Sequence, residues 1–114
     1  GGDGSAAEVT VSAFPGDVGG VPANVNRWRT QIGLDPVPGA EIDQMVSSLD
    51  VMGGQAKLVD MTGKKGAQAT RVIGIIVPRG GQTWFYKLMG DAAVAEREKT
   101  AFIKFVQSVR YPNA

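Results

Sequence analysis

The stretch ATRVIGIIVPRGGQTWFYKLMG, residues 69–90, decides the fold because a glycine pair separates two long, β-rich apolar runs. Glycine reaches the positive φ values that two-residue hairpin turns require. We therefore expect two antiparallel strands joined by a tight turn at Gly80-Gly81. This central hairpin is the element around which the other segments are placed.

The two-residue turn fixes the register of the hairpin, starting from a pair between Arg79 and Gln82. Opposite residues share a face of the sheet, and successive residues alternate between faces. One predicted face carries the pairs Val77/Trp84, Ile75/Tyr86 and Ile73/Leu88. The other face carries Val72, Ile76, Phe85 and Met89, with Gly74 opposite Lys87. Because both faces are apolar, each needs a covering layer.

The composition limits the classes of function. The chain has 114 residues, 43% of them hydrophobic, which predicts one domain with an ordinary core. A net charge of +1 gives no field that would attract nucleic acid. The absence of cysteine and histidine excludes disulfides, thiolate nucleophiles, the usual zinc sites and Ser-His-Asp catalysis. Every apolar run is shorter than the ~18 residues of a transmembrane helix. We also expect no cofactor and no metal.

The N-terminal part predicts a tail followed by a strand. Residues 1–7 are small and polar, so we expect disorder there and a single α+β domain over residues 8–114. EVTVSAF, residues 8–14, alternates in the manner of a half-buried strand. We expect this strand near a sheet edge, or paired with a segment outside the chain. The chain opens on GGDGS without a methionine, so we also expect its natural form to extend further.

A first helix is predicted over VPANVNRWRTQIGL, residues 21–34, because its apolar residues recur at helical spacing and place Trp28 in the core. Asn24, Arg27 and Gln31 follow one border of the apolar stripe. We interpret this polar row as structural, capping or tethering a neighbouring loop. An interaction surface is the alternative.

Two further segments precede the hairpin. Residues 40–49 predict a short second helix, and residues 55–62 predict a strand that pairs with the first hairpin strand. Lys64 and Lys65 follow between glycines and predict a solvated loop tip.

A last helix is predicted from Asp91, its N-cap, through Arg110, with a break near Thr100. Its apolar stripe includes Phe105 as a core residue. We expect this helix to cover one face of the hairpin. The helix that contains Trp28 is expected to cover the other face, or to cover the same face together with the last helix.

Three features invite a functional interpretation. PGDVGG, residues 15–20, joins a strand to a helix, but it lacks the GxxxxGK[ST] and GxGxxG spacings of phosphate loops, so a simple bend is favoured. The carboxylates Asp60, Asp91 and Glu96 are candidates for acid–base chemistry, although their positions fix no distance between any two of them. The hairpin turn presents a cation at a rigid tip. The candidate interaction surface therefore comprises Arg79, Gln82, Asn24, Arg27 and Gln31.

Three segments carry a resemblance: AEVTVSAFPGDVGGVPANVNRWRTQIGL (residues 7–34), VPRGGQTWFYKLMGD (77–91) and AFIKFVQSVRY (101–111). Together they resemble a family of uncharacterised bacterial exported proteins, often lipoproteins, which is similar in outline to the PsbP-like fold. The resemblance implies an α/β/α sandwich, location at the cell envelope or periplasm, and at least one strand ahead of Glu8, outside this chain. The metal-binding and protein-contact residues of PsbP-like proteins cannot be matched to residues of this sequence.

From these observations we expect a non-catalytic binding or interaction domain of a bacterial cell-envelope protein. Its expected partner is an unknown protein or a second copy of itself, paired through an exposed sheet edge. One alternative is a structural subunit completed by a missing N-terminal segment or a partner chain. A carboxylate-based hydrolase is the remaining alternative.

Overall fold

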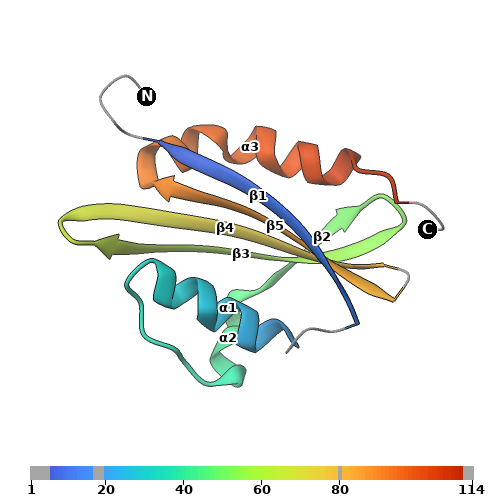
Figure 1. Ribbon diagram of the computed structural model, residues 1–114, viewed down its shortest axis with the longest axis horizontal. Coiled ribbons are helices and arrows are strands. Elements are labelled where there is room, and N and C mark those ends of the chain that lie inside the picture. Colours follow the sequence, from blue (N-terminus) through green and yellow to red (C-terminus); the bar gives the residue numbers. More distant parts are fainter. Residues whose placement is uncertain (1–5, 17–19, 80, 112–114) are drawn as a thin grey trace.

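The computed structural model describes residues 6–16, 20–79 and 81–111 and has an α+β architecture. Five antiparallel strands form one sheet in the order β1-β5-β4-β3-β2. Helix α3 lies on one face of the sheet, and α1 and α2 lie on the other (Figure 1). The strands are β1 (Ala7–Pro15), β2 (Ser47–Val51), β3 (Gly54–Lys65), β4 (Gln68–Arg79) and β5 (Gln82–Asp91). The helices are α1 (Gly20–Gln31), α2 (Gly39–Met45) and α3 (Ala92–Ser108).

The register predicted for the central hairpin, β4 and β5, is confirmed. Arg79 pairs with Gln82, Ile75 with Tyr86, and Gly74 with Lys87. Gly81 has a φ of 82°, which fits the expected tight turn, while Gly80 lies outside the described residues. The pairing of β3 with β4 ends at Ile76, so Pro78 removes no hydrogen bond from that ladder.

Each face of the hairpin has its own hydrophobic core, as its two apolar faces predict. On the α3 side, hairpin residues pack with Ala95, Phe102 and Val106 of the helix. On the α1 side, they pack with Val25, Trp28 and Ile32, and with Ile42 of α2. The sheet is therefore the shared wall between two separate cores.

Trp28 fixes the position of α1 on the sheet. Its indole lies directly over Gly74, where an added Cβ would stand 2.2 Å from the ring atom Cζ3. The Phe85 ring meets the indole edge-on, with 6.4 Å between ring centroids. Only a residue without a side chain at position 74 lets the tryptophan reach this depth, and Trp28 is 2% exposed as a result.

The C-terminal end of α1 makes a second close contact with the sheet. A Cβ on Gly63 would lie 2.1 Å from the Ile32 carbonyl oxygen, and one on Gly33 would lie 2.2 Å from the Lys64 carbonyl oxygen. The prediction that Lys64 and Lys65 form a loop tip is wrong. Both residues belong to β3 and pair with Ala69 and Gln68 of β4. The glycine at position 63 serves the helix contact and does not end the strand.

The predicted helix over residues 40–49 is also wrong in its second half. Helix α2 ends at Met45, and the backbone is extended at Val46 (φ −92°, ψ 132°) before β2 begins. Gly53, with a φ of 83°, turns β2 back onto β3 in a tight hairpin. A short apolar run fits the helical and the strand period equally well, and here the glycine turn decides between them.

Helix α3 differs from its prediction in two respects. It runs without a break through Thr100 and ends at Ser108, before the expected Arg110. Phe105, expected in the core, is 47% exposed, whereas Phe102 is 5% exposed. Thr100 is exposed on the outer side of the helix, where a β-branched residue does not interrupt the backbone.

Strand β1 lies at the predicted edge of the sheet and pairs with β5. It begins at Ala7, inside the expected tail, while residues 1–5 lie outside the described part. The expected alternation is weak: on the α3 side Ala7 and Ala13 are partly buried, but Val9 and Val11 are still 49% and 47% exposed. Helix α3 packs mainly on β4 and β5 and also contacts β2, while β1 lies beyond β5 at the edge of the sheet (Figure 1).

Replacing Gly74 by alanine is expected to lower the free energy of unfolding by about 1–3 kcal/mol, because the new methyl group collides with the indole. The same substitution in a Trp28→Leu background should cost less, since leucine leaves room for it. Urea unfolding of the four proteins measures this coupling. Equal costs in the two backgrounds would show that the tryptophan does not set the requirement for glycine.

The two phenylalanines of α3 offer a matched pair. Phe102→Ala should cost about 3–5 kcal/mol through the cavity it leaves. Phe105→Ala should cost clearly less, because about half of its surface is already in water, although its ring meets Tyr86 edge-on. Chemical denaturation midpoints compare the two directly, and a larger loss for the Phe105 variant would contradict this packing of α3.

Candidate functional site

The open edge of β1 is a candidate functional surface because half of its backbone groups have no strand to pair with. The ladder with β5 is closed at its two ends by the bonds Asp91 N to Ala6 O (2.9 Å) and Gly16 N to Gly81 O (2.7 Å). In an antiparallel ladder only alternate residues bond to a given neighbour. Even-numbered residues of β1 therefore bond to β5. Odd-numbered residues direct their N–H and C=O groups outward, and these include Val9, Val11 and Ala13.

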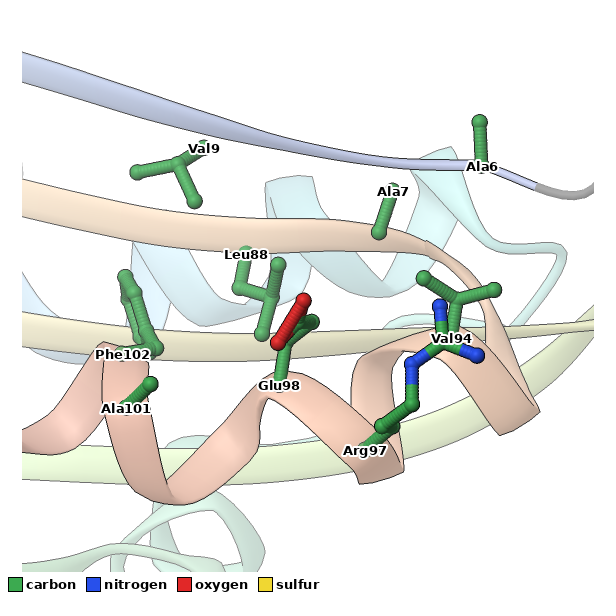
Figure 2. Close-up of a pocket in the computed structure, with 9 residues that line it drawn as sticks. All are labelled: Ala6, Ala7, Val9, Leu88, Val94, Arg97, Glu98, Ala101 and Phe102. Atoms are coloured by element: carbon green, nitrogen blue, oxygen red, sulfur yellow. The ribbon is translucent and has the colours of Figure 1, made fainter. Parts of the chain in front are cut away.

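The same odd-numbered residues place their side chains on the α3 side of the sheet, because Val9 pairs with the core residue Leu88. They form an apolar row in which Val9 and Val11 are 49% and 47% exposed. Between this row and α3 lies a groove of about 420 Å³ (Figure 2). It is lined by Ala6, Ala7, Val9, Leu88, Val94, Arg97, Glu98, Ala101 and Phe102.

Among the described residues that line this groove, charged groups occur only on the α3 wall. Arg97 and Glu98 project from α3 toward the space below β1, while alanine, valine and leucine side chains form the opposite wall and floor (Figure 2). No sequence motif marks Arg97 or Glu98 as part of a site. Alternation predicts a strand at residues 8–14, but it cannot show that no helix covers the strand.

The opposite edge of the sheet, β2, is less suited to contact. It has five residues, and Ser47, Ser48 and Asp50 make it polar. Gln107 of α3 donates a hydrogen bond to the Asp50 carbonyl oxygen at 3.0 Å, so the last helix ties this strand to the domain. Short, polar, partly covered edges are the usual protection against unwanted strand pairing.

Arg79 and Gln82, predicted to form a contact surface at the hairpin tip, have different surroundings. Arg79 is half-buried and donates hydrogen bonds to the carbonyl oxygens of Met52 and Pro78. Its guanidinium also lies 5.3 Å from the centroid of the Tyr111 ring. The arginine thus joins the hairpin to the β2–β3 turn and the C-terminal segment, whereas Gln82 is exposed beside Pro15 of β1.

The predicted polar row on α1 is divided between the interior and the surface. Asn24 is 2% exposed and donates to the Gly20 carbonyl oxygen at 2.6 Å. Gln31 accepts a hydrogen bond of 2.9 Å from the Lys87 ammonium group. Arg27 is exposed. Two of the three residues therefore bind within the molecule, Asn24 inside its own helix and Gln31 to β5, whereas the loop after α1 is tethered by Asn26, which exchanges hydrogen bonds with the Val37 backbone.

The three candidate carboxylates all have partners. Asp60 accepts two hydrogen bonds from Arg71 and one from Lys99, and Glu96 binds the same arginine from the other side. These bonds, with Arg71 the strongest cause, lower the pKa of Asp60 although partial burial opposes them. Asp91 caps α3 by accepting from the backbone of Ala93 and Val94. A carboxyl group held ionised in this way is a poor general acid.

The glycine bend considered as a phosphate loop includes residues 17–19, which lie outside the described residues. Among the residues that are described, no three acidic side chains gather in a way that would hold a metal ion. None of the helices in this part of the chain combines the length and the apolar character needed to cross a membrane.

Comparison with known protein families gives no match, and comparison with curated proteins gives none either. The fold is similar to a crystal structure of PA94 from Pseudomonas aeruginosa, a protein of unknown function that has been suggested to be a regulator. The TM-score is 0.55 with 8% sequence identity, over 96% of this chain and 85% of that chain. At this identity the similarity concerns the fold alone.

The Asp60 ion pairs predict a specific loss of stability in acid. A depressed pKa contributes stability that is fully present above the ordinary value of about 3.9 and is lost as the pH falls through the lowered value. Asp60→Asn should therefore cost about 1–3 kcal/mol at neutral pH and much less at about pH 2.

Urea unfolding at the two pH values measures this difference. Asp43→Asn, at an exposed position of α2, is the control and should change little at either pH. An Asp60→Asn cost that does not shrink in acid would mean that the ion pairs contribute little.

Proposed function

We propose that the protein is a non-catalytic interaction domain that associates with a second copy of itself through the open edge of β1. One observation carries this proposal: a nine-residue edge strand turns unpaired backbone groups outward and exposes an apolar row beside them. Edge strands of monomeric domains are normally short, charged or covered. In β1, Glu8 is the only charged residue, and its one proline is the last residue of the strand.

Self-pairing of β1 would give a regular antiparallel register. Two antiparallel copies related by a two-fold axis through Val11 would place Val9 opposite Ala13 of the other copy. The same faces of the two sheets then adjoin, so the two apolar rows merge on the α3 side. Glu8 would lie opposite Phe14, so that no like charges meet.

The cell-envelope location is part of this proposal and is supported by the resemblance to exported bacterial proteins. The related proposal of a PsbP-like fold is supported by the antiparallel sheet with helices on both faces. A structural subunit completed by a strand from another chain is the second candidate, since the same open edge would receive that strand. A hydrolase is less favoured because Asp60 and Glu96 are both held by Arg71.

A proline at position 11 tests the β1 pairing. Val11→Pro removes an outward N–H without removing a hydrogen bond between β1 and β5. The matched control Val11→Thr keeps both the N–H and the β-branched shape. Light scattering across a concentration series should show the wild-type and threonine proteins rising from one chain to two, while the proline variant remains a single chain.

Circular dichroism and urea midpoints check that the variants keep the fold. A wild-type protein that remains monomeric at the highest concentration would overturn self-association and leave the foreign-strand candidate. Equal dimerisation of the proline and threonine variants would show that another surface is used.

A further inference from the structure

Phe105 of α3 is exposed on the side of the helix that faces β1. Its side chain is 47% exposed, and its ring meets Tyr86 of β5 edge-on, with 6.1 Å between the ring centroids. Along α3 it follows Val94 and Ala101 at helical spacing, and both of these residues line the groove beside β1. The phenylalanine therefore continues the α3 wall of that groove.

The exposed valines of β1 adjoin Phe105. Val11 is the strand partner of Tyr86, and its side chain lies on the same face of the sheet. Val9, two residues earlier on the same face, lines the groove together with Ala101. Val9, Val11 and Phe105 therefore form one apolar patch, shared between a strand edge and a helix. Contiguous exposed apolar surface is a mark of an interaction site.

A molecule that covers this patch has to meet two requirements. It must present a strand edge to the outward N–H and C=O groups of β1, and it must present an apolar side chain beside that edge to Phe105. A second copy of this chain offers both, because its own Phe105 lies beside its own β1. Building on the proposed pairing of β1, on which this inference rests, we propose that Phe105 faces its counterpart across the two-fold axis of the dimer.

The register of the paired strands places Phe105 beside this axis. β1 spans Ala7–Pro15 and Val11 is its central residue, so pairing the whole strand with its copy brings the two Val11 residues together. Each Val11 lies beside a Tyr86, and each Tyr86 is in contact with a Phe105 ring. At a strand spacing of about 4.8 Å, the two Tyr86 backbones would stand about 14 Å apart. The two phenylalanine side chains would lie above this interval, on opposite sides of the axis.

The charges on α3 are compatible with this approach. Arg97 and Glu98, which line the groove, precede Phe105 by seven positions or more. A two-fold axis makes the two helices antiparallel, so at a rise of 1.5 Å per residue the like charges of the two copies are more than about 20 Å apart. Lys104 is exposed and projects on the opposite side of the helix from the buried Phe102, away from the sheet.

An exchange of charges at position 105 tests whether the two copies face each other there. Phe105→Glu and Phe105→Lys each place two like charges beside the axis and should weaken dimerisation by at least about tenfold. An equimolar mixture of the two proteins brings opposite charges together and should recover the two-chain species. Light scattering across a concentration series compares the two variants, their mixture and the wild-type protein.

Met52→Glu is the matched control, because Met52 is 42% exposed and lies in the β2–β3 turn at the other edge of the sheet. It should dimerise as the wild-type protein does, and urea midpoints check that every variant keeps the fold. Dimerisation of both Phe105 variants at the wild-type level, or a mixture that remains monomeric, would overturn the placement of Phe105 at the axis. Loss of dimerisation in Val11→Pro would then still support the β1 pairing. A wild-type protein that remains a single chain would overturn both proposals.

Discussion

The contact between Trp28 and Gly74 is the constraint on which the rest of the structure depends. The indole reaches the sheet only where a strand residue lacks a side chain, and this depth sets the distance between α1 and β4. Once α1 is seated there, Ile32 meets the backbone of β3 at Gly63. The two glycines thus position the helix along the sheet, and the apolar residues between them fill the space.

The helix layers also explain why one edge of the sheet is open. Helix α3 packs over β4 and β5 and is hydrogen-bonded to β2 through Gln107. It therefore lies toward the β2 edge of the sheet and away from β1. Strand β1 contributes no residue to the fully buried part of either core. Its position depends on backbone pairing and on the edge-on contact of Phe14 with Phe85. Strand β1 therefore forms part of the molecular surface and adds little to the two cores.

Sequence patterns predicted those parts of the fold that local chemistry determines. The glycine turn fixed the register of β4 with β5, and alternation showed that both faces need cover. Exposure could not be predicted in the same way, because periodicity marks Phe105 and Val11 as apolar without showing which neighbour reaches them. The need for glycine at position 63 could not be predicted either, because it comes from the carbonyl oxygen of Ile32, which is distant in the sequence. The pairing of Lys87 with Gln31, 56 residues apart, is equally invisible before folding.

The separation of the core by the sheet has a spectroscopic consequence. The chain has two tryptophans, and each belongs to a different core: Trp28 lies beneath α1, and Trp84 packs beside Tyr111 on the α3 side. Intrinsic fluorescence therefore contains one independent signal from each side of the same sheet. Proteins that retain a single tryptophan would show whether the two halves of the interior melt as one cooperative unit.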